Sequence, residues 1–184
     1  MRRLLPLLGL VCAVACAVPA VAADLPPASI PGPQKPDLSA LQGWVGAWSC
    51  STKSSRHANA ITGTASYGFD PGGRWLVNSG TVNPVPWFPY NGATTEFITY
   101  DAGRKHWVDI YIDSNGNFQV STSPGPSGAT WVWHDLRLQE PAGDIASYGD
   151  ATTTVQARAL TTEYRVKTKA GKSFDVKTVC KRMS

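Results

Sequence analysis

Two cysteines near opposite ends of the chain constrain its fold more than any other feature of the sequence. Cys50 lies in the first strand-like segment and Cys180 lies in the last. A disulfide between them would fasten the two ends of the fold together. A closed β-barrel brings these two ends side by side, because closure pairs the first strand with the last. The two cysteines therefore favour a closed barrel in an oxidising compartment.

The first 23 residues have the pattern of a secretory signal peptide. Two arginines precede an almost wholly apolar run over residues 4–18, and small residues follow it. The run is shorter than the roughly 20 residues that a membrane-spanning helix needs. We therefore expect cleavage after Ala22 or Ala23 and no transmembrane segment thereafter. A lipoprotein whose mature chain begins at Cys16 is the alternative.

Removal of the signal leaves Cys50 and Cys180 as the only cysteines, and an oxidising compartment would pair them. It also lowers the formal net charge, +4 for the whole chain, by two. So small a charge, with no basic run outside the C-terminal strands, argues against a nucleic-acid partner. We expect a proline-rich lead-in over residues 24–42 and a single domain over residues 43–184.

Beyond the lead-in, the residue pattern predicts β-structure throughout. Apolar and polar residues alternate between turns marked by glycine, proline and asparagine, and no helical period is sustained. The expected strands cover residues 49–53, 60–69, 75–82, 95–100, 105–113, 117–123, 130–138, 152–159, 162–168 and 173–182. This pattern indicates an all-β, up-and-down antiparallel meander that closes into a β-barrel of about eight to ten strands.

Alternation also assigns side chains of the terminal strands to faces. Trp48 shares a face with Cys50, and Arg182 shares a face with Cys180. If the cysteines lie directly opposite each other on antiparallel strands, Trp48 must lie opposite Arg182. The guanidinium would then stack over the indole in a cation–π pair, with Lys181 pointing outward.

A Gly-x-Trp motif on the first strand, capped by an arginine on the last, resembles the calycin superfamily of lipocalin-like barrels. More narrowly, the chain resembles a group of small secreted bacterial domains of unknown function. The similar stretches are residues 46–50, 67–70, 73–76, 171–174 and 179–182. The resemblance covers most of the chain from Gly43 to Arg182 and implies a barrel of eight to ten strands. It implies no single function, because such barrels bind many ligands.

The segment 84–92, from Pro84 to Gly92, combines strand-breaking prolines with the aromatic residues Trp87, Phe88 and Tyr90. Its functional interpretation is a lid over the mouth of the barrel, or an apolar surface for a partner. Its structural interpretation is a plug that folds back and seals one end.

Two further pairs of residues are candidates for ligand contact. Trp131 and Trp133 share a strand face and would either stack on a ligand or fill the core. His106 and His134 would either meet inside the barrel, where they could hold a metal or haem, or serve as hydrogen-bonded structural histidines. Their spacing matches no metal motif, so we expect no metal and no cofactor.

Glu96, Asp109, Asp113 and Asp135 are acidic side chains that could be recruited for acid–base chemistry. Asp109 and Asp113 share a strand face with Lys105, so we expect them in solvent. The sequence contains no nucleophile elbow, no Ser–His–Asp order and no phosphate-binding loop. We therefore expect that the protein is not an enzyme.

Together these features predict a monomeric, periplasmic or secreted binding protein that holds a small, mostly apolar or aromatic ligand inside the barrel. The alternative is a structural or interaction domain with a filled barrel, which engages an envelope partner through the segment 84–92. A cavity lined by aromatic residues would favour the first interpretation, and a solid core would favour the second.

Overall fold

The computed structural model describes residues 34–89, 91–139 and 143–184, with residues 135–139 described by their backbone alone. The expected signal peptide, its cleavage site, Cys16 and the start of the lead-in lie outside the described residues. Within the described part, no helix is long and apolar enough to cross a membrane.

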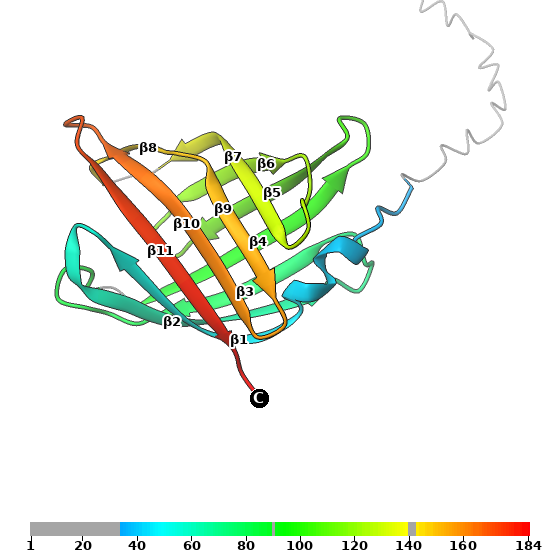
Figure 1. The fold of residues 1–184 in the computed structure, drawn as a ribbon, viewed down its shortest axis with the longest axis horizontal. Coiled ribbons are helices and arrows are strands. Elements are labelled where there is room, and N and C mark those ends of the chain that lie inside the picture. Colours follow the sequence, from blue (N-terminus) through cyan, green and yellow to red (C-terminus); the bar gives the residue numbers. More distant parts are fainter. Residues whose placement is uncertain (1–33, 90, 140–142) are drawn as a thin grey trace, which may run out of the picture. The chain divides into compact units, whose positions relative to one another are not determined.

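The described chain is a closed antiparallel β-barrel (Figure 1). One short 3-10 helix precedes eleven strands: η1 (Ser39–Trp44), β1 (Gly46–Ser54), β2 (His57–Phe69), β3 (Leu76–Val82), β4 (Gly92–Asp101), β5 (His106–Asp113), β6 (Phe118–Ser123), β7 (Thr130–Gln139), β8 (Ile145–Tyr148), β9 (Ala151–Gln156), β10 (Ala159–Thr168) and β11 (Ser173–Arg182). The sheet closes because β1 pairs with both β2 and β11. The all-β barrel expected from the sequence is confirmed.

Two details differ from the expected strands. The short strand β8 was not expected; it pairs with the end of β10, whereas β9 pairs with its start, so together they fill one place in a ring of ten. The turn between β9 and β10 lies at Ala157 and Arg158 rather than after Ala159. Small and hydroxyl residues dominate this region, so its sequence contains neither a strong turn signal nor a strong apolar alternation.

The expected seam is confirmed residue by residue. Cys50 pairs with Cys180 and is bonded to it, and Trp48 pairs with Arg182 on the same two strands. The guanidinium carbon of Arg182 lies 4.2 Å from the centroid of the Trp48 ring. Trp48 is fully buried, whereas Lys181 is exposed.

Arg182 also binds backbone that the sequence pattern did not connect with it. Its Nε donates to the carbonyl of Ala157 (2.9 Å), Nη1 to that of Val45 (2.5 Å) and Nη2 to that of Gly43 (2.9 Å). Gly46 has φ +133°, and a Cβ there would collide with the guanidinium. The glycine of the Gly-x-Trp motif thus leaves room for Arg182 to cross the start of β1.

A hydrophobic cluster fills one part of the barrel interior. Its members are Leu38, Leu41, Trp44, Trp48, Leu76, Ile98, Trp107, Trp131, Trp133, Leu160 and Cys180. Three of them come from η1 and the residue before it, a stretch that the sequence placed largely in the lead-in. Leu41 is fully buried, and the Trp44 carbonyl accepts a hydrogen bond from the indole of Trp48 (2.8 Å). We call this cluster the aromatic floor, because it bounds the cavity described next.

Candidate functional site

The barrel interior beyond the aromatic floor is hollow. The cavity has a volume of about 460 Å³, which lies within the range of small-molecule sites. Trp44 and Trp133 belong both to the floor and to the cavity wall. Most other lining residues are the inward-facing members of successive strands, as the two-residue period requires.

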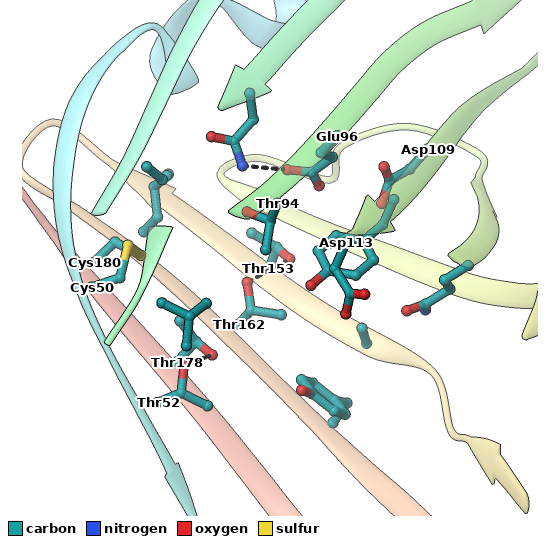
Figure 2. Close-up of a pocket in the computed structure, with 18 of the residues that line it drawn as sticks. Cys50, Thr52, Thr94, Glu96, Asp109, Asp113, Thr153, Thr162, Thr178 and Cys180 are labelled. Carbon is teal, nitrogen blue, oxygen red and sulfur yellow. Dashed lines mark hydrogen bonds between the residues drawn. A yellow bond between two sulfur atoms is a disulfide. The ribbon is translucent and has the colours of Figure 1, made fainter. Parts of the chain in front are cut away.

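One wall carries three carboxyl groups. Asp109, Tyr111 and Asp113 alternate along β5 and line the cavity, and Glu96 pairs with Tyr111 from the neighbouring strand β4. The carboxyl groups thus occupy three successive levels of the wall. Figure 2 shows them pointing into the pocket from adjacent strands. We call this the acidic wall.

Glu96 lies in the middle of the acidic wall. Its Oε2 accepts hydrogen bonds from the Tyr67 hydroxyl (2.8 Å) and the Asn78 amide (3.2 Å). Burial raises the pKa of Glu96 above its usual value, although these hydrogen bonds oppose the shift.

Asp113 is held by the turn between β5 and β6. Its Oδ1 accepts from the backbone N–H of Asn115 (2.8 Å) and of Asn117 (3.1 Å), and its Oδ2 accepts from the Asn117 side-chain amide (2.8 Å). These bonds fix the direction of the carboxylate. The Asp113 side chain therefore keeps a set position at the end of β5.

The wall across the ring is lined by hydroxyl groups and the disulfide. The strand order places β10 and β11 diametrically opposite β4 and β5. The hydroxyls of Thr52 and Thr178 form a hydrogen bond (2.9 Å), as do those of Thr153 and Thr162 (3.0 Å). The Cys50–Cys180 bridge lies beside the first pair (Figure 2).

Aromatic rings complete the lining. The tyrosines are Tyr67, Tyr111, Tyr148 and Tyr164, and Trp44, Phe88 and Trp133 add three further rings. Burial raises the pKa of Tyr111 well above its usual value, with a further contribution from the charge of Asp113. Burial and the neighbouring Glu96 raise that of Tyr67 in the same direction, so both tyrosines remain neutral hydroxyl groups at physiological pH.

Only part of the set of aromatic candidates lies at the cavity. Trp133 and Phe88 line it, whereas Trp131 is buried in the floor between Trp107 and Trp133. Trp87 stacks on His57, with ring centroids 4.0 Å apart, and is not a lining residue. Tyr90 lies outside the described residues.

The two candidate histidines do not line the cavity. His134 is exposed, and its Nδ1 lies 2.8 Å from a carboxylate oxygen of Asp150. His106 precedes the inward-facing Trp107 and so lies on the other face of β5. Among the described residues, no group of three or more His, Cys, Asp and Glu side chains is arranged to hold a metal ion.

The sequence analysis missed the acidic wall because it expected Asp109 and Asp113 in solvent. Val108, Ile110 and Ile112 alternate with Asp109, Tyr111 and Asp113, and the apolar set is normally the buried one. Here the apolar set faces outward, and Ile112 is 43% exposed. Our expectation that Asp109 and Asp113 are solvated on the outside is therefore wrong. The bulk of Trp107, which shares the inner face, was the available signal.

The raised pKa of Glu96 makes stability depend on pH. The folded protein retains the proton of the Glu96 carboxyl group at pH values where the unfolded chain has lost it. The free energy of unfolding therefore falls as pH rises through the folded pKa of Glu96. We expect Glu96→Gln to be more stable than the wild type at pH 7–8, and equal to it near pH 4. A pKa that is one unit higher in the folded protein than in the unfolded chain corresponds to about 1.4 kcal/mol of unfolding free energy.

Denaturant unfolding of both proteins between pH 4 and 8 measures this difference. Glu163→Gln is the matched control, because Glu163 is exposed on the outer face and forms an ion pair with Lys177. A Glu96→Gln protein that is less stable than the wild type at pH 7 would contradict the argument. It would show that the hydrogen bonds to the carboxylate outweigh its desolvation.

Comparison with known proteins gives a fold but no family. No protein-family model and no curated protein matches the sequence. Among solved structures, the barrel is similar to the crystal structure of Rv2717c from M. tuberculosis, with a TM-score of 0.60 and 10% sequence identity. The match covers 79% of this chain and 98% of the other. At this identity the likeness shows a shared barrel architecture alone.

Proposed function

We propose that the protein is an exported, non-catalytic binding protein that holds a small molecule inside its barrel. The observation that carries the proposal is the cavity of about 460 Å³ between the acidic wall and the hydroxyl-lined wall. A barrel that served only as a scaffold gains stability from a filled interior, because unfilled space forfeits packing contacts. A hollow of this size is the feature that distinguishes a binding protein from such a scaffold.

The lining supports a more polar ligand than the sequence alone suggested. Carboxyl, amide and hydroxyl groups come from nearly every strand, and aromatic rings lie between them. A mostly apolar ligand would leave these groups without hydrogen-bond partners from the ligand. We therefore propose a ligand with polar groups and an apolar body that packs against the tyrosines.

We further propose that the barrel is a calycin, that it is exported and that it acts as a monomer. The Trp48–Arg182 pair across the seam supports the first assignment. The Cys50–Cys180 disulfide supports an oxidising compartment. Closure of the ring supports a monomer, because it leaves no long sheet edge for pairing with a second copy.

The segment 84–92 is proposed as the rim of the binding site. Val85 and Phe88 form a two-residue bridge, and the Trp87 indole donates to the carbonyl of Asn59 on β2 (3.0 Å). Trp87 thereby fastens the segment to β2, and Phe88 reaches the cavity. This arrangement supports a rim that borders the ligand rather than a plug that fills the barrel.

A second candidate function, as an interaction domain, has one observation in its favour. Val77, Phe97, Ile110 and Val120 lie in register across β3, β4, β5 and β6, on the face opposite to the cavity lining. Ile112 extends this outer apolar row. A protein partner could pack on such a row.

Filling the cavity separates the two candidates. We expect Thr178→Phe to project a ring into the cavity from β11 and to lower at least tenfold the fraction of protein that retains a small molecule. Val179→Phe is the matched control, because its side chain alternates with the lining residues Thr178 and Cys180 and faces outward. Native mass spectrometry of the proteins purified from their own cell envelope measures the retained molecule. Equal occupancy in wild type and Thr178→Phe would overturn the proposal and favour the interaction domain.

A further inference from the structure

We infer that the ligand of the barrel cavity is a polyhydroxylated compound, a sugar or a polyol, and that a row of four threonines is its main hydrogen-bonding subsite. The inference rests on the proposed function and specifies the chemistry of the same site. Three features carry it: the register of the threonines, the hydrogen-bonding capacity of their hydroxyl groups, and the arrangement of polar groups and rings around them.

Four inward-facing threonines lie side by side on four neighbouring strands. Thr52 on β1 pairs with Thr178 on β11. Thr162 on β10 pairs with Thr178 on one side and with Thr153 on β9 on the other. All four line the cavity, and Figure 2 shows them in a row along one wall. Neighbouring strands lie about 4.8 Å apart, so the row presents hydroxyl groups over a length of about 14 Å. We call it the threonine ladder.

The threonine ladder can both donate and accept hydrogen bonds. The hydroxyls of Thr52 and Thr178 bond to each other (2.9 Å), and so do those of Thr153 and Thr162 (3.0 Å). A bond between two hydroxyl groups uses only one of their two hydrogens, so each pair keeps one hydrogen and several lone pairs for a third partner. Within the described part of the chain, these four hydroxyls form no other hydrogen bond. A hydroxyl group of the ligand complements them, because it too donates and accepts.

Threonine is an unusual choice for a wall that serves packing alone. Threonine and valine have nearly the same shape, and both suit a β-strand. A buried hydroxyl group costs free energy unless it is hydrogen-bonded, so packing alone would favour valine. Thr153 is only 2% exposed, yet its bond with Thr162 leaves one hydroxyl hydrogen without a partner in the described chain. The ligand would supply that partner.

The rest of the cavity suits a molecule with polar edges and apolar faces. Thr94 and Glu96 on β4 place a hydroxyl and a carboxyl group on the wall opposite the threonine ladder. Tyr164 shares the inner face of β10 with Thr162, and its ring meets that of Tyr148 edge to face, with centroids 5.5 Å apart. A sugar carries hydroxyl groups around its edge and C–H groups on its faces, so it can bond to both walls while one face packs on a ring. A ligand with a single polar end would leave one wall without hydrogen bonds to the ligand.

A panel of phenyl glycosides tests the inference: phenyl β-D-glucoside, phenyl β-D-galactoside and phenyl α-D-mannoside. The comparison compound is 2-phenoxytetrahydropyran, which keeps both rings and lacks every hydroxyl group. Isothermal titration calorimetry measures the binding of each compound to the full-length mature protein. We expect at least one glycoside to bind at least tenfold more tightly than 2-phenoxytetrahydropyran.

Valine variants remove one hydroxyl group and keep the shape of the cavity. Thr162→Val should weaken binding of the best glycoside about tenfold and leave the affinity for 2-phenoxytetrahydropyran unchanged. Thr52→Val, in the other hydroxyl pair, repeats the test. Thr161→Val is the matched control, because Thr161 precedes Thr162 on β10, faces outward and pairs with the outward-facing Val179. This control should change neither affinity.

Three results would overturn the inference: equal affinity for the glycosides and 2-phenoxytetrahydropyran, failure of all three glycosides to bind, or equal losses in Thr162→Val and Thr161→Val. The small molecule retained in native mass spectra tests the binding function separately. If Thr178→Phe abolishes that retention while no glycoside binds, the binding function stands and the polyhydroxylated ligand does not.

Discussion

Replacing both Cys50 and Cys180 by alanine is expected to lower the free energy of unfolding by about 4–5 kcal/mol. The bridge joins residues 130 positions apart, so it closes almost the whole barrel into one loop. In the chain-entropy model the bond removes conformations from the unfolded chain, and the gain grows with loop length. A loss of this size is a large part of the stability of an ordinary domain.

Urea unfolding of the double variant, followed by tryptophan fluorescence, measures the effect. The slope of the unfolding free energy against urea concentration should rise, because an unfolded chain without the cross-link exposes more surface. Wild type in reductant is the control, since it lacks the bond but keeps both sulfur atoms; its stability should fall nearly as far. A loss below about 1 kcal/mol, with an unchanged slope, would show that the bond contributes little to the closure of the barrel.

Arg182→Ala is expected to have the second largest effect, a loss of about 3 kcal/mol of unfolding free energy. The substitution removes the guanidinium from the Trp48 ring and three hydrogen bonds to the carbonyls of Gly43, Val45 and Ala157. The bonds to Gly43 and Ala157 are exposed, so water can donate to these carbonyls once the guanidinium is gone, and their loss costs little unfolding free energy. The partly buried bond to Val45 and the contact with Trp48 account for most of the loss.

Three further variants test the geometry of this contact. Lys181→Ala, one residue away on the outer face, should be near neutral. Arg182→Lys should recover only part of the loss. A lysine ammonium group cannot donate to all three carbonyls that the wide, planar guanidinium reaches. Gly46→Ala should destabilise by displacing the guanidinium, and its effect should not add to that of Arg182→Ala. Additive effects would show that the two residues act independently.

The seam is the part of the fold that the sequence specified most completely. An oxidising compartment would pair the two cysteines, and this pair sets the register of the first and last strands. The two-residue period of a strand then predicts the Trp48–Arg182 contact. These inferences needed only local rules, because a disulfide fixes one pair of residues and alternation then fixes their neighbours. The three carbonyl partners of Arg182 could not be inferred in this way. They belong to segments that meet only after the chain has closed.

The candidate site shows what local rules leave undecided. Alternation divided β5 correctly into one set with Val108 and Ile110 and another with Asp109 and Asp113, but it did not say which set faces inward. The general preference for apolar residues inside a protein gave the wrong answer. A barrel that encloses a hollow can place polar groups on its inner face, where they border a cavity rather than a packed core.

The sequence by itself determined the strands other than β8, the closure of the barrel, the disulfide and the contact that stacks Arg182 on Trp48. Each of these follows from the spacing of residues along one or two strands. The tertiary structure alone decided that Leu41 and Trp44 fill one part of the barrel while Glu96, Asp109 and Asp113 line another. The physical reason is that a cavity is defined by the distance between opposite walls. That distance depends on the number of strands and on every side chain that fills the space between them.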